Sequence, residues 1–124
     1  MSTSTFNSQS QNVLELIKGL ELEQEEKHVT LTSDEMAAAV YPYYMYWEPK
    51  FHRHDCDQIF YVLEGEGVFV LKDDDGNEEK FDVTVGSHFV VPKNVWHGMY
   101  CKNGDRALTL QVNKKTMTTE KLDA

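Results

Sequence analysis

An all-β fold, a sandwich or barrel of short strands with one short helix near the N-terminus, is the fold class that the sequence predicts. From about residue 28 onward, stretches rich in aromatic and β-branched residues follow one another. Glycine, asparagine and proline turn signals divide these stretches about every eight to twelve residues. No helical periodicity separates them, which is typical of antiparallel sandwiches and barrels.

The N-terminal part carries a polar tail and then the helix. Residues 1–11 are mostly Ser, Thr, Gln and Asn with almost nothing to bury, which predicts a flexible tail. Apolar residues then recur at the spacing of an amphipathic helix, at Val13, Leu16, Ile17 and Leu20. Gly19 and the acidic run after it limit this helix to two or three turns. We expect it to pack against the body of the domain or against a second subunit.

The first strands are predicted over residues 28–72. Residues 28–33 alternate between polar and apolar side chains, and residues 37–54 are dense in β-favouring ones. Residues 58–72 predict two strands joined at Gly65–Gly67. The run DDDGN that follows predicts a hairpin turn in which Gly76 is free to adopt a positive φ.

The remaining strands are predicted over residues 78–112. Residues 78–101 give two or three strands, divided by Gly86 and Pro92. Residues 101–112 predict a further hairpin with Asn103-Gly104 at its tip.

Length and charge narrow the class of protein. A chain of 124 residues with no internal linker or repeat predicts one domain, over residues 12–124, behind the tail of residues 1–11. Its 21 acidic residues outnumber the 12 lysines and arginines, which gives a net charge of −9. This charge argues against nucleic acid as a partner. No membrane-length apolar run and no secretory signal are visible, so we expect a soluble, cytoplasmic protein without a membrane partner. Cys56 and Cys101 are expected to be free thiols.

The stretch FHRHDCDQIF suggests a metal site. On a β-strand His52 and His54 point to the same face, about 6 to 7 Å apart along the strand, which suits two imidazoles that bind one ion. The triplet DCD can turn the chain so that Gln58 opens the next strand toward the same interior. His97, just after a Pro-Lys-Asn turn, is the candidate for a third nitrogen ligand. A His-x-His pair alone is equally typical of exposed or hydrogen-bonded histidines.

The order of these residues resembles the cupin family. The first cupin motif is matched in spacing by His52, His54, Gln58 and Gly65, and the second by Gly86, Pro92, His97 and Cys101. The resemblance covers residues 40–112. It implies a double-stranded β-helix, or jelly-roll barrel, around one divalent metal ion held by His52, His54, Gln58 and His97.

Four positions depart from the family pattern. Tyr46 replaces the first glycine of motif one, Asn94 the turn glycine of motif two, and Cys101 the terminal asparagine of motif two. Asparagine tolerates left-handed backbone geometry, so the turn at Asn94 is expected to form.

The fourth departure bears on chemistry, because Gln58 replaces a ligand glutamate with a neutral amide. The implied ligand set carries no charge, so the ion keeps its full +2, binds less tightly and attracts an anionic or chelating substrate. Gln58 also cannot act as a general base. The alternative is that Gln58 is a core amide satisfied by backbone while three histidines hold the metal.

The pocket around the ion is predicted from strand alternation. Tyr44 and Tyr46 are candidates for an acid or base on its inner face. The residues expected to line the pocket for substrate are Glu48, Lys50, Phe60, Met99 and Cys101. Of the other histidines, His88 is expected to be structural or to support a metal ligand from behind, and His28 to lie at the surface.

Three functions agree with this site. The favoured one is a small-molecule oxygenase or dioxygenase with Fe(II), since neutral ligands leave positions open for a chelating substrate and O₂; Mn, Ni, Co and Zn stay open as the metal. The second is a non-redox isomerase, lyase or cyclase that uses the ion as a Lewis acid. The third is a non-catalytic cupin that binds or senses a small ligand. A homodimer is expected, because the aromatic segment VYPYYMYW and the N-terminal helix would otherwise leave apolar surface exposed.

Overall fold

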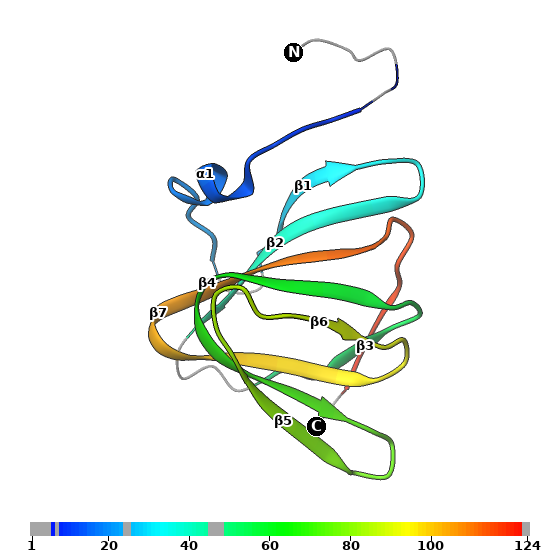
Figure 1. Ribbon diagram of the computed structural model, residues 1–124. Coiled ribbons are helices and arrows are strands. Elements are labelled where there is room, and N and C mark those ends of the chain that lie inside the picture. Colours follow the sequence, from blue (N-terminus) through cyan, green and yellow to red (C-terminus); the bar gives the residue numbers. More distant parts are fainter. Residues whose placement is uncertain (1–5, 7, 24–25, 45–48, 123–124) are drawn as a thin grey trace.

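The structure is a computed structural model that describes residues 6, 8–23, 26–44 and 49–122. One short helix precedes a set of antiparallel strands (Figure 1). The elements are α1 (Val13–Ile17), β1 (His28–Thr32), β2 (Met36–Tyr44), β3 (His52–His54), β4 (Gln58–Lys72), β5 (Glu78–Val83), β6 (His88–Val91), β7 (Trp96–Lys114) and β8 (Thr119–Lys121). No helix in these ranges is long and apolar enough to cross a membrane.

Two long strands, β4 and β7, belong to both halves of the curled sheet. The first half of β4 pairs with β6 and with the second half of β7, which in turn pairs with β2, and β2 with β1. The second half of β4 pairs with β5 and with the first half of β7, which in turn pairs with β3, and β3 with β8. The predicted all-β jelly-roll barrel with a short N-terminal helix is therefore confirmed.

Both long strands bend at a glycine. The hairpin predicted at Asn103-Gly104 was wrong, and the two strands predicted to join at Gly65–Gly67 form one continuous strand. Gly65 and Gly104 have positive φ values of 82° and 79°. The pairing of β4 with β7 shifts register between Val62 and Gly67, as it does at β-bulges. Each strand therefore continues past its glycine and pairs with the other on both sides of the bend.

Two other predicted turns, at Gly76 and Asn94, formed where they were expected. Gly76 adopts φ 88° in the turn between β4 and β5, and Asn94 adopts φ 62° in the turn before β7. Both match the expectation that these residues accept left-handed geometry. The helix is shorter than predicted and ends at Ile17; Asn12 caps it by accepting from the backbone of Leu14 and Glu15.

The main core fills the space between the two halves of the sheet. Phe60 from the first half and Phe69 from the second are fully buried, with ring centroids 5.3 Å apart. The buried residues of this cluster are Tyr43, Phe60, Val62, Phe69, Val83, Val91, Met99, Cys101 and Ala107. Burial of these side chains supplies most of the driving force for closing the barrel.

A second, smaller cluster lies on the outer face of the sheet, under the N-terminal segment. Ile17 and Leu22 pack there against Val40, Leu63 and Leu108. This packing agrees with the expectation that the helix covers the body of the domain. On the same outward face, Ile59 and Val90 are paired neighbours and about half exposed (53% and 57%). The homodimer stays a prediction, and this uncharged pair marks a face that it could use.

Candidate metal centre

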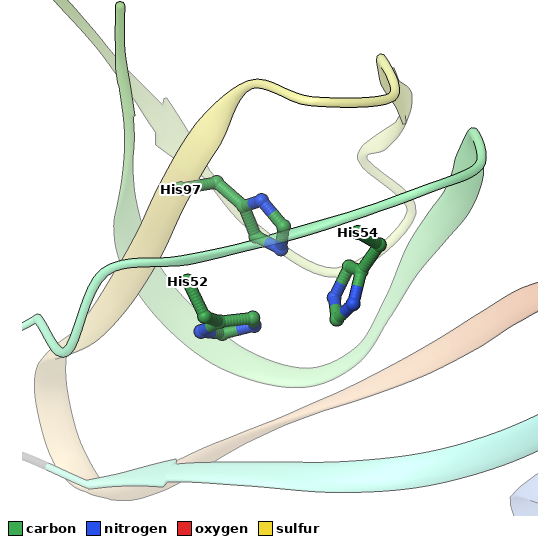
Figure 2. A group of neighbouring side chains, drawn as sticks. All are labelled: His52, His54 and His97. Atoms are coloured by element: carbon green, nitrogen blue, oxygen red, sulfur yellow. The ribbon is translucent and has the colours of Figure 1, made fainter. Parts of the chain in front are cut away.

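Three histidines from two neighbouring strands lie side by side (Figure 2). His52 and His54 project from β3 to the same side, and His97 stands opposite His52 as its Cα partner on β7. Their ring centroids lie 4.4 to 5.1 Å apart. Their ligand atoms lie within 4.8 Å of one another, a spacing at which all three could hold one ion.

Hydrogen bonds prepare these three rings for the same role. Nδ1 of His52 lies 3.0 Å from the carbonyl of Lys50, and Nδ1 of His97 lies 3.0 Å from that of Val95. Nδ1 of His54 lies 3.2 Å from the carbonyl of Thr118 and 3.1 Å from its neighbour's hydroxyl, Thr119 Oγ1. A carbonyl oxygen only accepts, so each Nδ1 carries the hydrogen. Each Nε2 is left as the electron-pair donor that a metal requires.

Burial keeps two of the rings neutral. It lowers the pKa of His97 to about 3, with the neighbouring His52 adding to the effect. It lowers the pKa of His54 to about 4 for the same two reasons. Both imidazoles are therefore unprotonated at neutral pH, which is the form that binds a cation.

The metal-free protein should lose stability as the pH falls below about 6.5. The unfolded chain binds protons at His54 and His97 with a pKa near 6.5, whereas the folded chain binds them only near 4 and 3. Between these pKa values the unfolded state holds more protons than the folded state, so the free energy of unfolding decreases as the pH is lowered. Melting temperatures of apo protein between pH 7.5 and 4.5 measure this. The double variant His54→Gln/His97→Gln should show a weaker dependence of melting temperature on pH. A dependence as steep as that of the wild type would mean that these two histidines are not its cause.

Gln58 adds a fourth candidate donor atom. Its side chain is 1% exposed, and its Nε2 donates to Oδ1 of Asn113 at 3.2 Å and to Oε1 of Gln111 at 3.5 Å. On the same face of β4, the ring of Phe60 lies 6.1 Å from that of His97, so this face is turned toward the histidines. The Gln58 amide thus bonds to side chains, which differs from the alternative of an amide satisfied by backbone.

Two orphaned atoms test whether these residues fit a cation. Among the described residues, the buried side-chain nitrogens and oxygens without a hydrogen-bond partner are Gln58 Oε1 and His97 Nε2. Each offers a lone pair, and a buried acceptor without a partner costs about 1 to 3 kcal/mol. Two buried electron-pair donors, with His52 and His54 beside one of them, fit a divalent ion and no apolar ligand.

A row of polar side chains inside the barrel was missed by the sequence reasoning. Thr109, Gln111 and Asn113 alternate along β7 and form hydrogen bonds in the interior. The signal was present as the alternation of TLQVN, but its polarity is reversed, because the apolar Leu110 and Val112 take the opposite face. Interior polar residues of this kind are typical of a site rather than of a core.

The last strand supports His54 from outside. β8 pairs with β3, and its first residue, Thr119, contacts the His54 ring. Arg53 reaches across to Glu120 at 2.8 Å and covers the ring of Trp96 at 4.3 Å. Asp55 accepts from the backbone N–H of Thr118, which lowers the pKa of that carboxyl. This support for a ligand was not predicted, because the three residues of β8 carry no strand signal.

The predicted pocket residues are distributed unevenly around the centre. Phe60 lies beside His97, whereas Met99 and Cys101 are buried in the main core. Burial raises the pKa of the Cys101 thiol, and its Sγ contacts the carbonyl of Asn103. Both cysteines are free, as expected. Lys50 is exposed, and what it contributes to the centre is its carbonyl bond to His52.

The tyrosine prediction shifts by one residue. The hydroxyl of Tyr44 donates to the carbonyl of Leu22, on the outer face of the sheet. Tyr43 faces the main core instead, and burial raises its pKa far above the usual range, so it stays protonated. Tyr46 and Glu48 lie outside the described residues. The prediction that Tyr44 is on the inner face was wrong, because Tyr44 and His52 belong to separate strands and do not share one alternation.

The remaining histidines lie apart from the centre. His88 is exposed on β6 and stacks on Tyr61, with ring centroids 6.2 Å apart. His28 is partly exposed at the start of β1. Neither belongs to the group of residues that could hold a metal.

A family model and one curated protein match the sequence. Residues 46–113 match the model described as Cupin domain. A stretch of 54 residues is 35% identical to auxin-binding protein T85 of Nicotiana tabacum, covering 40% of this chain and 29% of that protein. The chain thus spans less than a third of that relative.

Solved structures share the fold at low identity. A cupin-2 domain protein of Shewanella frigidimarina has a TM-score of 0.67 and 17% identity, over 84% of this chain and 93% of the other. Hydroxypropylphosphonic acid epoxidase of S. wedmorenis, in complex with fosfomycin, has a TM-score of 0.57 and 23% identity, over 63% and 43%. Oxalate decarboxylase of Bacillus subtilis, described with Mn(II) centres, has a TM-score of 0.67 and 18% identity, over 83% and 29%.

Proposed function

The chain belongs to the cupin family, and from this premise we propose that it is a metal-dependent enzyme for a small anionic or chelating substrate, an Fe(II) oxygenase in the first instance. The observation that carries the proposal is the common tautomer of His52, His54 and His97. Each ring directs its N–H to a protein acceptor and keeps Nε2 for an ion.

The charge of the centre supports the substrate class. Three neutral imidazoles and the Gln58 amide would hold a divalent ion without any compensating carboxylate. An anion therefore gains more from this ion than it would from one with a glutamate ligand. A bound divalent ion supplies Lewis acidity, and a redox-active one also supplies electron transfer to an oxidant.

The residues of the chain position and shield the substrate. His52 is the least buried of the three ligands, so we place the open side of the centre there. Phe60 and Phe69 lie against His97, with ring centroids 6.1 and 5.9 Å from it, and keep water from the inner side. Neither Gln58 nor the protonated Tyr43 can accept a proton at neutral pH, so proton transfer is assigned to the substrate or to a residue outside this group.

Metal analysis and oxygen uptake test the proposal. Purified protein is stripped, reloaded separately with Fe(II), Mn(II), Co(II), Ni(II) and Zn(II), and mixed with diketones, catechols, thiols and small keto, hydroxy, dicarboxylic and phosphonic acids. Of these compounds the acids are tested first, because two enzymes of this fold are named for oxalate and a phosphonic acid. We expect oxygen consumption only with iron. Turnover without oxygen, on Zn(II) or Mn(II), would instead establish the isomerase, lyase or cyclase.

A binding protein is the second candidate. The 35% identity to a protein named for binding auxin favours it over the matched 54 residues. Titration of the same acids, with auxin added to the panel, separates the two functions. Metal-dependent binding without turnover under any metal would replace the enzyme by a binding module.

A further inference from the structure

The interior row on β7 sets the direction in which the Gln58 amide points. We propose that Thr109 and Gln111 are positioning residues that hold the oxygen of Gln58, rather than its NH₂ group, toward the metal centre. This inference rests on the proposed metal site and goes beyond it, because it explains how a neutral amide is made a dependable donor.

The direction is fixed first at Thr109, which is fully buried. Its hydroxyl donates to the backbone carbonyl of Tyr41 at 3.3 Å. That carbonyl only accepts, so the single hydroxyl hydrogen of Thr109 is used there. Toward every other neighbour the Thr109 oxygen is an acceptor.

Gln111 takes its orientation from this acceptor. Its Nε2 donates to Thr109 Oγ1 at 3.1 Å and to the hydroxyl oxygen of Tyr43 at 3.2 Å. A flipped Gln111 would set its own oxygen against the lone pairs of Thr109. The amide oxygen of Gln111 therefore faces Gln58.

Gln58 meets two oxygens as a result. Asn113 also presents its oxygen, since its own Nδ2 donates to the carbonyl of Lys114 at 2.8 Å. The nitrogen of Gln58 turns to these two acceptors, at 3.2 and 3.5 Å, and Oε1 is left buried and unpartnered on the other arm of the amide. A carboxylate at position 58 would place oxygen against oxygen, so the row favours an amide there.

The chain of donors thus runs in one direction, from Gln58 through Gln111 and Thr109 to the carbonyl of Tyr41. Because the last acceptor in this chain is the carbonyl of Tyr41, every side chain in it donates away from the metal centre. Gln58 Oε1, at the start of the chain, therefore keeps its electron pair free. If the row is broken, the amide can rotate and present N–H groups, which repel a cation. Loss of such an orienting partner typically weakens metal binding about 10- to 100-fold.

A double-mutant cycle on metal affinity tests this. Apo protein is titrated with Mn(II), and the free ion is followed by its electron paramagnetic resonance signal. The variants are Gln111→Met, Gln58→Met and the double variant, with Gln9→Met as a matched glutamine outside the centre. We expect Gln111→Met to raise the dissociation constant about 10- to 100-fold in the wild-type background and less than about 3-fold in the Gln58→Met background.

The cycle separates positioning from a general structural role. Equal losses in both backgrounds, or no loss in either, would overturn the inference. If Gln111→Met fails to fold, the same cycle is run with Thr109→Val, which should weaken binding, and with Thr109→Ser, which keeps the hydroxyl and should restore it. Wild-type protein that binds no Mn(II), Fe(II) or Zn(II) would instead defeat the proposed function itself.

Discussion

His97→Ala should weaken the binding of a divalent metal at least about 100-fold, which is more than the loss of a partner behind a ligand usually costs. The substitution removes one of three converging donors, and the only one that is both 1% exposed and without a partner at Nε2. No other described His, Cys, Asp or Glu belongs to the group that could take its place. Calorimetric titration of apo protein with Co(II) or Mn(II) measures the change.

The matched control for this substitution is His88→Ala, which removes an exposed histidine on β6. It should leave the dissociation constant within about 3-fold of the wild-type value, which corresponds to about 0.7 kcal/mol. Comparable losses from His97→Ala and His88→Ala would mean that the three-histidine group is not where the ion binds. Circular dichroism of both variants establishes that any loss is not due to unfolding.

Gly65→Ala should lower the free energy of unfolding by about 3 kcal/mol or more, because two penalties combine at this position. The backbone of Gly65 has φ +82°, a conformation that L side chains rarely adopt. An added Cβ would also lie 2.6 Å from the carbonyl oxygen of Arg106, on the partner strand β7. Denaturant unfolding of the metal-free protein at neutral pH gives the value.

Gly76→Ala separates the two penalties. Gly76 has nearly the same φ, +88°, but its added Cβ would meet nothing within 4 Å. This substitution should cost only about 1 kcal/mol, the usual penalty for left-handed geometry. If Gly65→Ala and Gly76→Ala cost the same, close contact between β4 and β7 at the bend would not be what requires a glycine.

The parts of the centre that depend on local pattern could be predicted from the sequence. His52 and His54 share a face because a strand has a period of two, whatever it pairs with. Gln58 and Phe60 were expected to face inward for the same reason, and both are buried. The Tyr44 prediction failed because it relied on one alternation counted back from His52, whereas the two residues belong to separate strands, β2 and β3.

The parts that depend on distant partners could not be predicted. A glycine with positive φ is compatible with a hairpin and with a bent strand. Gly104 lies in a bent strand, because β7 pairs with β4 on both sides of it. The interior row of Thr109, Gln111 and Asn113 was missed because the inward alternation was followed from His97 only to Cys101, before the hairpin predicted at Asn103-Gly104. The direction of its hydrogen bonds follows only once the carbonyl of Tyr41 is known to receive the Thr109 hydroxyl.

The strand β8 makes the metal centre and the C-terminal segment parts of one equilibrium. Thr118 and Thr119 hold the ring of His54 in the tautomer that binds a cation. By thermodynamic reciprocity, whatever free energy this strand contributes to metal affinity, a bound ion returns to the docking of the strand. Metal binding is therefore expected to make residues 118–121 detach from β3 less readily, so their detachment reports whether the ion is bound.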